Sequence, residues 1–131
     1  MTVEFKQSHN KLNRDVFESV CAFLNRNGGH LFLGVEDKGE VVGVTKDAID
    51  KVKKDFITSM NNPQKISPTF YLSVEEFQIN GKTMLYIFVP ESSQVHRCNG
   101  RIFDRNEDGD MDITDNTNQV SAMYMRKRYL Y

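Results

Sequence analysis

The stretch CAFLNRNGGHLFLGVEDKGEVVGV, residues 21–44, passes from a helical to an extended pattern within a few positions. From about Lys11 to Asn27, apolar residues recur every three or four positions, which indicates an amphipathic helix. Asn27, Gly28 and Gly29 supply the left-handed stop that ends many helices, and glycine also allows close backbone packing. The apolar run from 30 to 35 then predicts a buried strand. This stretch therefore predicts a sharp corner between a helix and a strand.

Patterns on either side of this corner complete an α/β domain. Turns are indicated at Lys38-Gly39 and, more strongly, at Asn80-Gly81, so each should join two strands as a hairpin. We expect strands over 2–6, 30–35, 40–44, 69–78, 83–89 and 100–105, and helices over 11–27, 46–60 and 117–128. The order β-α-β-β-α-β-β-β-α predicts an α/β fold with a mixed sheet and about three helices.

The bulk composition restricts the class of protein. The 131 residues are 39% hydrophobic and 27% charged with a net charge of −1, so one domain over 1–131 is expected, either alone or as a fragment of a longer protein. This balance excludes a polycationic nucleic-acid binder, although a local basic patch remains compatible with it. No apolar run approaches the roughly 20 residues that span a bilayer, and the first residues lack a signal-peptide pattern. We expect a cytoplasmic protein with no membrane partner.

Two motifs are similar to ligand-binding loops, but each can also be an ordinary turn. Gly81-Lys82-Thr83 is similar to the end of a phosphate-binding loop, but Glu76 stands where that loop needs glycine, so a hairpin turn is expected. The segment DRNEDGDMDITD, residues 104–115, has calcium-loop spacing but follows an expected strand rather than a helix. Its alternative is a solvated acidic turn before the last helix, and we expect no metal there. The candidate calcium ligands are Asp104, Asn106, Asp108, Asp112 and Asp115.

Three acids remain as candidate catalytic residues. Glu4 lies on the first strand, and Glu36 and Asp37 follow the strand that leaves Gly29. If those two strands pair, Glu4 and Asp37 could converge and hold a divalent cation, as nucleases require. The alternative is that Glu4 pairs with a neighbouring lysine while Glu36 and Asp37 begin a turn.

Several stretches together resemble one known family. VEFK (3–6), AFLNRNGG (22–29) and LFLGVEDKGEVVGV (31–44) are similar to the Schlafen AlbA-like (AlbA_2) domain. GRIFDRNEDGDMDITDN (100–116) resembles the late strand that precedes the closing helix of that family. The family occurs in bacterial DNA-binding proteins and transcriptional regulators and in animal Schlafens. The resemblance implies an α/β fold and nucleic-acid binding.

In Schlafens that cleave structured RNA, the resemblance implies two glutamates around the first strand and one acid after the later strand. Glu4 matches one glutamate, and Glu36 or Asp37 matches the later acid. The other glutamate has no counterpart, because only Met1, Thr2 and Val3 precede Glu4. Two acids would hold Mg²⁺ or Mn²⁺ poorly. We therefore expect no required cofactor, and a metal-dependent endoribonuclease using Mg²⁺ or Mn²⁺ is the alternative.

The first hypothesis is thus a nucleic-acid-binding domain, with DNA favoured over RNA, in a protein such as a transcriptional regulator. Contacts to phosphate would come from basic side chains, although each could equally be an ordinary surface charge. The candidates are Lys51, Lys53, Lys54, Lys65, Arg97, Arg101 and Arg105, backed by Arg126, Lys127 and Arg128. A further alternative is a protein-interaction module or homo-oligomer that uses the C-terminal segment. That segment contains Met123, Tyr124, Met125, Tyr129, Leu130 and Tyr131.

Overall fold

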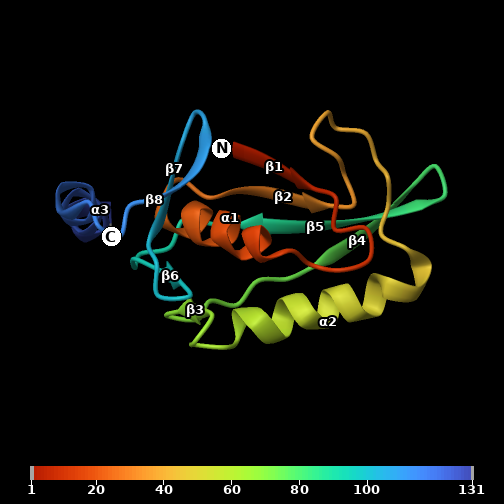
Figure 1. The fold of residues 1–131 in the computed structure, drawn as a ribbon, viewed down its shortest axis with the longest axis horizontal. Helices are drawn as coiled ribbons and strands as arrows, with labels where there is room; N and C mark the ends of the chain where they lie inside the picture. The colour runs from red at the N-terminus through yellow and green to blue at the C-terminus, as the bar shows by residue number, and fades with distance from the viewer. Residues whose placement is uncertain (1, 131) are drawn as a thin grey trace.

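A computed structural model describes residues 2–130 of the chain (Figure 1). Met1, Tyr131 and the side chain of Leu130 lie outside the described residues, so the interaction role expected for Leu130 and Tyr131 is not addressed. The helices are α1 (Arg14–Asn25), α2 (Ile49–Met60), preceded by the 3-10 turn η1 (Lys46–Ala48), and α3 (Thr117–Leu130). The strands are β1 (Thr2–Lys6), β2 (Gly29–Leu33), β3 (Ile66–Ser67), β4 (Glu75–Ile79), β5 (Lys82–Val89), β6 (Arg97–Cys98), β7 (Phe103–Asn106) and β8 (Gly109–Asp112).

The main sheet has the strand order β1-β2-β5-β4. β1 runs parallel to β2, while the β2–β5 and β4–β5 pairs are antiparallel, so the predicted mixed sheet is confirmed. A parallel pair needs a crossover, and α1 supplies it between β1 and β2. This crossover makes the first strand a neighbour of the strand that follows Gly28.

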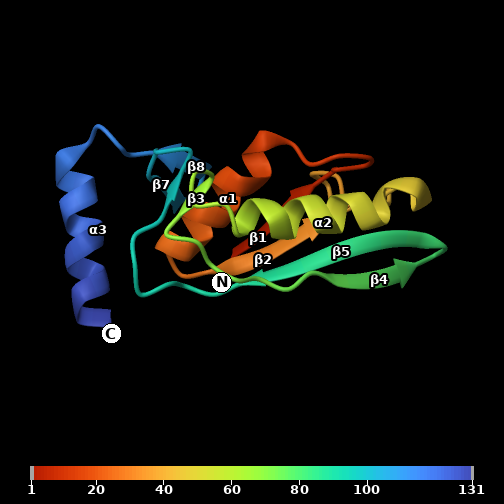
Figure 2. The ribbon, with the colours of Figure 1, turned by 90° about the horizontal axis from the view of Figure 1, so that it is seen from below.

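Alternation along β2 and β5 divides the sheet into two faces. Leu31 and Leu33 of β2, with Leu85 and Ile87 of β5, are fully buried on one face. Figure 2 shows α1 and α2 on one side of the sheet and no helix on the other. The buried face and the two helices form the main core, where the rings of Phe17 and Phe56 stack at 5.6 Å.

The opposite sheet face carries a network of partly exposed aromatic rings. His30 and Phe32 of β2 contact Tyr86 of β5 with ring centroids 5.7 and 5.1 Å apart, and the His30 Nδ1 lies 2.6 Å from the Tyr86 hydroxyl. Phe77 of β4 and Phe88 of β5 extend the network and remain exposed. This face is therefore ordered by its own side chains without a covering helix.

The corner between α1 and β2 requires glycine at Gly28. Its φ of +68° is left-handed, and a Cβ built there would lie 2.5 Å from the backbone oxygen of Val89. A Cβ on Gly29 would instead meet the ring of Phe23 at 2.6 Å. The Gly28 N–H donates to the Phe23 carbonyl at 2.9 Å, which closes the end of the helix. The two glycines thus let α1 turn and pack directly against β2 and β5.

The segment after β2 differs from the expectation of a second strand over 40–44. Only single bridges form, between Val35 and Val41 and between Val44 and Thr83. Gly34 and Gly43 have φ values of +87° and +84°, and left-handed residues interrupt an extended ladder. The predicted hairpin strand is therefore wrong, and an irregular loop takes its place.

Other segments also differ from the sequence expectations. The strand expected over 69–78 begins at Glu75, because residues 69–74 have no strand partner while Leu72 packs into the core. The strand expected over 100–105 begins at Phe103. The acidic segment expected to be a loop forms the β7–β8 hairpin, with Asn106 paired to Gly109. The short strands β3 and β6, which the pattern did not indicate, pair with each other.

α3 stands apart at one end of the sheet (Figure 1) and contacts α1 through two basic residues. The Lys127 ammonium is buried and donates to the carbonyls of Leu24 at 2.9 Å and Ser92 at 2.6 Å. Arg126 donates to the carbonyl of Asn25, and both cations contact Glu91. These contacts satisfy carbonyls at the end of α1 that no helical N–H reaches. Arg126 and Lys127 are therefore engaged in contacts within the fold.

Among residues 2–130, no helix combines the length and apolar character needed to cross a membrane. The tail of α3 is mixed, since Met123 is buried while Tyr124, Met125 and Tyr129 are exposed.

His96 is a buried neutral histidine that connects three segments. Its Nδ1 lies 2.7 Å from the Pro68 carbonyl, which can only accept, so Nδ1 carries the hydrogen. Its Nε2 lies 2.7 Å from the Ser92 hydroxyl and therefore accepts from it. Burial lowers the pKa of His96 from 6.5, and the charge of Lys127 adds to the effect against the opposing hydrogen bond to Pro68.

We expect this histidine to make the protein less stable in mild acid. As the pH falls below about 6.5, the unfolded chain takes up the His96 proton first, so the free energy of unfolding decreases by up to ~1.4 kcal/mol per pH unit. Urea denaturation at pH 7.5 and 5.5 measures this loss. His96→Gln, which cannot titrate at this position, should show a flatter dependence. Identical pH dependence in both proteins would contradict the prediction.

Candidate nucleic-acid interface

Glu4 lies in a network of charged side chains beside β1. Its carboxylate is 3.2 Å from the guanidinium of Arg105 on β7 and 3.6 Å from the Lys6 ammonium. Arg105 also contacts the Asp110 carboxylate at 2.8 Å and lies over the Phe23 ring at 4.9 Å. Arg105 thus bridges Glu4 and Asp110 and neutralises both. Glu4 contacts the neighbouring Lys6, as one alternative expected, and also contacts Arg105, which that alternative did not include.

Asp110 is a site residue that the sequence interpretation missed. It faces Arg105 across the β7–β8 hairpin, and its other oxygen accepts a hydrogen bond of 2.5 Å from Ser19 on α1. A hairpin turn at Glu107-Asp108 would have predicted this pairing, because residues flanking a tight turn face each other.

The acids after β2 are only partly near Glu4. Asp37 is exposed and lines a shallow cavity of about 450 Å³ together with Val3, Glu4 and Phe5. Glu36 belongs to the turn, where its N–H donates to the Glu40 carbonyl at 3.0 Å. A hydrogen bond between the carboxyl groups of Glu36 and Glu40, together with desolvation and neighbouring negative charges, raises the pKa of Glu36. The structure thus brings Glu4 and Asp37 to one cavity and leaves Glu36 outside it.

These acids do not fit a divalent-ion site as they stand. No group of three histidine, cysteine or carboxylate side chains within residues 2–130 is placed to hold a metal ion. The carboxylate of Glu4 already faces two cations, Lys6 and Arg105, whose charges oppose a bound cation. A Mg²⁺ ion would have to displace these cations and would then find few carboxylate ligands.

The calcium-loop candidates lie along a β-hairpin and the turn after it, and three of them are paired with arginines. Asp104 accepts two hydrogen bonds from Arg26, at 2.8 and 2.9 Å. Asp112 and Asp115 both accept from Arg101, at 2.8 and 3.0 Å. Side chains on a hairpin alternate between its faces and cannot all converge on one ion. The structure therefore does not bring Asp104, Asn106, Asp108, Asp112 and Asp115 together as a calcium loop would.

Four of the seven basic candidates already have carboxylate partners within the chain. Lys51 contacts Asp55 at 2.6 Å and Lys53 contacts Glu76 at 3.3 Å, while Arg101 and Arg105 are engaged as described above. Lys65 lies over the Phe17 ring at 4.7 Å, and Arg97 donates to the Gly100 carbonyl at 3.3 Å. Lys54 is exposed and has no ion pair among the described residues. The predicted set is therefore mostly a set of internal ion pairs.

The family match covers most of the fold just described. Residues 1–114 match the family model Schlafen, AlbA_2, which includes β1 to β8 and excludes α3. This chain belongs to the Schlafen AlbA_2 family. The resemblance expected from the strings around Glu4, Gly28 and Gly34 is thereby confirmed.

Named relatives of this AlbA_2 domain include larger proteins. An uncharacterized ATP-binding protein of Ureaplasma parvum is 29% identical, and the match covers 70% of this chain and 30% of the relative. The solution structure of an amino-terminal domain from Nitrosomonas europaea, in a protein named as related to the ATP-dependent DNA helicase RecG, is 32% identical. It has a TM-score of 0.53, covering 68% of this chain and 62% of that domain.

The crystal structure of the DIP2311 protein from Corynebacterium diphtheriae shares the fold with a TM-score of 0.62 at 20% identity. That match covers 84% of this chain and 24% of the other. This AlbA_2 domain therefore spans less than a third of both the Ureaplasma and the Corynebacterium proteins.

Proposed function

We propose that this AlbA_2 domain binds nucleic acid through backbone phosphates, with DNA favoured over RNA, as part of a DNA-binding or transcription-regulating protein. The observation that carries the proposal is the family match over residues 1–114. Similarity to a domain of a RecG-related protein supports it, because the name of that protein refers to a DNA helicase. Contacts to phosphate give affinity with little sequence preference.

A metal-dependent endoribonuclease is the second candidate, favoured by the cavity that Glu4 shares with Asp37. The pairing of Glu4 with Arg105 and Lys6 opposes it, because metal binding would have to break those contacts. The binding function needs no such rearrangement and therefore ranks first.

We expect weak, salt-dependent binding without cleavage. Fluorescent duplex DNA, single-stranded DNA and a structured RNA hairpin would each be titrated at about 50 and 200 mM salt, with and without Mg²⁺ or Mn²⁺. Each neutralised phosphate contributes close to one unit to the slope of log affinity against log salt, so a slope of about −2 to −4 is expected. Gel analysis of the same samples reports strand cleavage.

No binding of any probe at low salt would contradict the binding function. RNA cleavage in Mn²⁺ that is lost in both Glu4→Gln and Asp37→Asn would instead place the nuclease first.

A further inference from the structure

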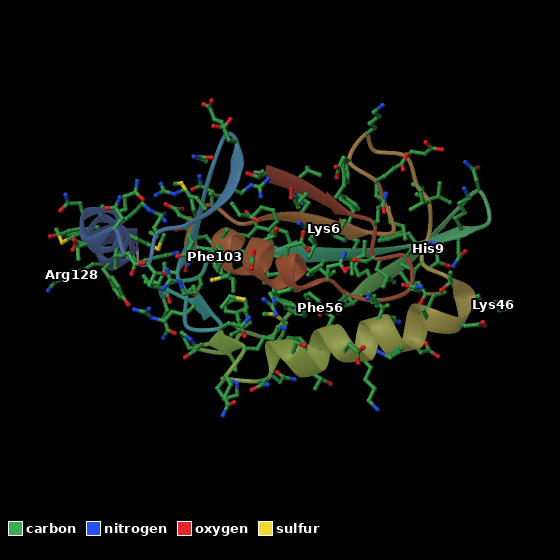
Figure 3. All side chains as sticks on the ribbon, viewed as in Figure 1. Lys6, His9, Lys46, Phe56, Phe103 and Arg128 are labelled. Atoms are coloured by element: carbon green, nitrogen blue, oxygen red, sulfur yellow. The ribbon has the colours of Figure 1, made fainter. Side chains whose placement is uncertain are left out.

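A cavity of about 430 Å³ lies where the loop after β2 meets the β4–β5 turn. It is walled by segments that are far apart in the sequence, and His9 and Lys46 lie at the end of the molecule away from Arg128 (Figure 3). Its size is within the roughly 300–1,000 Å³ typical of small-ligand sites. The polar side chains on its walls are His9, Thr45, Lys46, Gln78, Lys82 and Thr83, together with Glu76.

Backbone hydrogen bonds fix these walls relative to one another. The Val44 N–H donates to the Thr83 carbonyl at 2.8 Å, and the Thr45 N–H donates to the His9 carbonyl at 2.8 Å. The His9 ring closes the same corner, since its Nδ1 lies 2.8 Å from the Gly43 carbonyl and must donate to it. The cavity is thus built by contacts among three separate segments.

The walls offer hydrogen-bond donors that have few acceptors within the chain. Thr83 Oγ accepts from the Gln78 amide at 2.7 Å, which leaves the Thr83 hydroxyl hydrogen able to donate. The Lys82 ammonium has only a 3.5 Å contact with the Val41 carbonyl, and Lys46 has no partner among the described residues.

The charge around the cavity is positive. Among the described residues that line it, Glu76 is the only acid, and the ammonium of Lys53 lies 3.3 Å from its carboxylate. Lys46 and Lys82 are exposed and are not neutralised by a carboxylate. This distinguishes them from Lys51, Lys53, Arg101 and Arg105, whose charges are already paired.

We infer that this cavity binds a phosphate group, with Lys46 and Lys82 supplying charge and Thr45 and Thr83 donating hydrogen bonds. The ligand is then a backbone phosphate of a nucleic acid, which rests on the proposed function. A phosphate presents several oxygen acceptors to such a set of donors. The arrangement differs from a phosphate-binding loop, because Gly81 lies in the turn between β4 and β5, Lys82 and Thr83 begin β5, and side chains take the place of backbone N–H groups.

The test compares two double variants with the same change in net charge. Lys46→Gln/Lys82→Gln removes the unpaired lysines, and Lys51→Gln/Arg101→Gln removes cations that are paired with Asp55 and Asp112 and do not line the cavity. All four side chains are at least partly exposed, so both variants should fold, which a thermal melt confirms. Titration with labelled single-stranded and duplex DNA should show a roughly 5- to 20-fold loss for the first variant. The slope of its log affinity against log salt should become shallower by about 1.8 on duplex DNA and about 1.4 on single strands. The matched control should lose much less affinity.

Inorganic phosphate serves as a second probe, read from the backbone NMR signals of Thr45 and Thr83. If the parent protein binds DNA and both variants bind equally well, the cavity inference is overturned while the proposed function stands. The parent can also fail to bind nucleic acid while millimolar phosphate shifts these signals in the parent and the control but not in Lys46→Gln/Lys82→Gln. The proposed function then fails, and the cavity stands as a site for a free phosphate anion. No response to either probe would overturn both.

Discussion

Gly28→Ala is expected to lower the free energy of unfolding by about 3 kcal/mol or more. Two costs add at this position. The φ of +68° disfavours any residue with a Cβ, and the added carbon would lie 2.5 Å from the Val89 oxygen and 3.0 Å from the Glu91 nitrogen. Both neighbours are backbone atoms, so they cannot rotate away as a side chain would. Urea denaturation followed by circular dichroism measures the change.

Gly100→Ala is the matched control for this substitution. Its φ of +81° is similar, but nothing lies within 4 Å of the added Cβ, so only the conformational cost of about 1–2 kcal/mol should appear. Equal losses in the two variants would show that the corner between α1 and β2 relaxes around the methyl group.

Asn25→Asp is expected to destabilise the protein by about 3 kcal/mol or more. The buried Asn25 amide donates to the carbonyls of His96 at 3.0 Å and Phe103 at 2.8 Å, and its oxygen accepts from the His96 N–H at 2.7 Å. An aspartate of the same shape keeps the acceptor but turns a second, negatively charged oxygen toward two carbonyls. The urea midpoint at pH 7.5 reports the loss.

Asn62→Asp provides the comparison, because Asn62 is exposed and uses only its oxygen, which accepts from the Gln64 N–H at 3.0 Å. A carboxylate preserves that bond, and a change within about 0.5 kcal/mol is expected. A similar small change for Asn25→Asp would mean that water or a raised pKa accommodates the buried acid.

Local patterns predicted the parts of the fold that local physics determines. The helices α1 and α2 follow from apolar spacing, and the corner at Gly28 follows from a residue type that tolerates a left-handed backbone. The prediction of a strand over 40–44 was wrong, because apolar alternation does not reveal that Gly34 and Gly43 adopt left-handed φ values, which interrupt the ladder. The β7–β8 hairpin was not predicted, because the acidic segment has the spacing of a calcium loop as well as that of a hairpin. Only the pairing of Arg105 with Asp110 distinguishes the hairpin from the loop.

The candidate site was less predictable, since its properties depend on pairs distant in sequence. Lys51 with Asp55 is an i,i+4 pair that could have been recognised, and it argues against a phosphate contact at Lys51. No spacing rule links Arg105 to Glu4, or Lys53 to Glu76. Likewise, Lys46 and Lys82 share a cavity only because Val44 bridges to Thr83.

The contacts of α1 also determine when the domain can reach its final state during folding. Leu24 and Asn25, at the end of this early helix, are completed by His96, Phe103 and Lys127, which are synthesised much later. Closing such long loops costs entropy before any contact compensates it, so chains rich in distant pairs fold slowly. The end of α1 therefore acquires these hydrogen-bond partners only after the later segments have been synthesised. We expect this end of the helix to be completed late in folding.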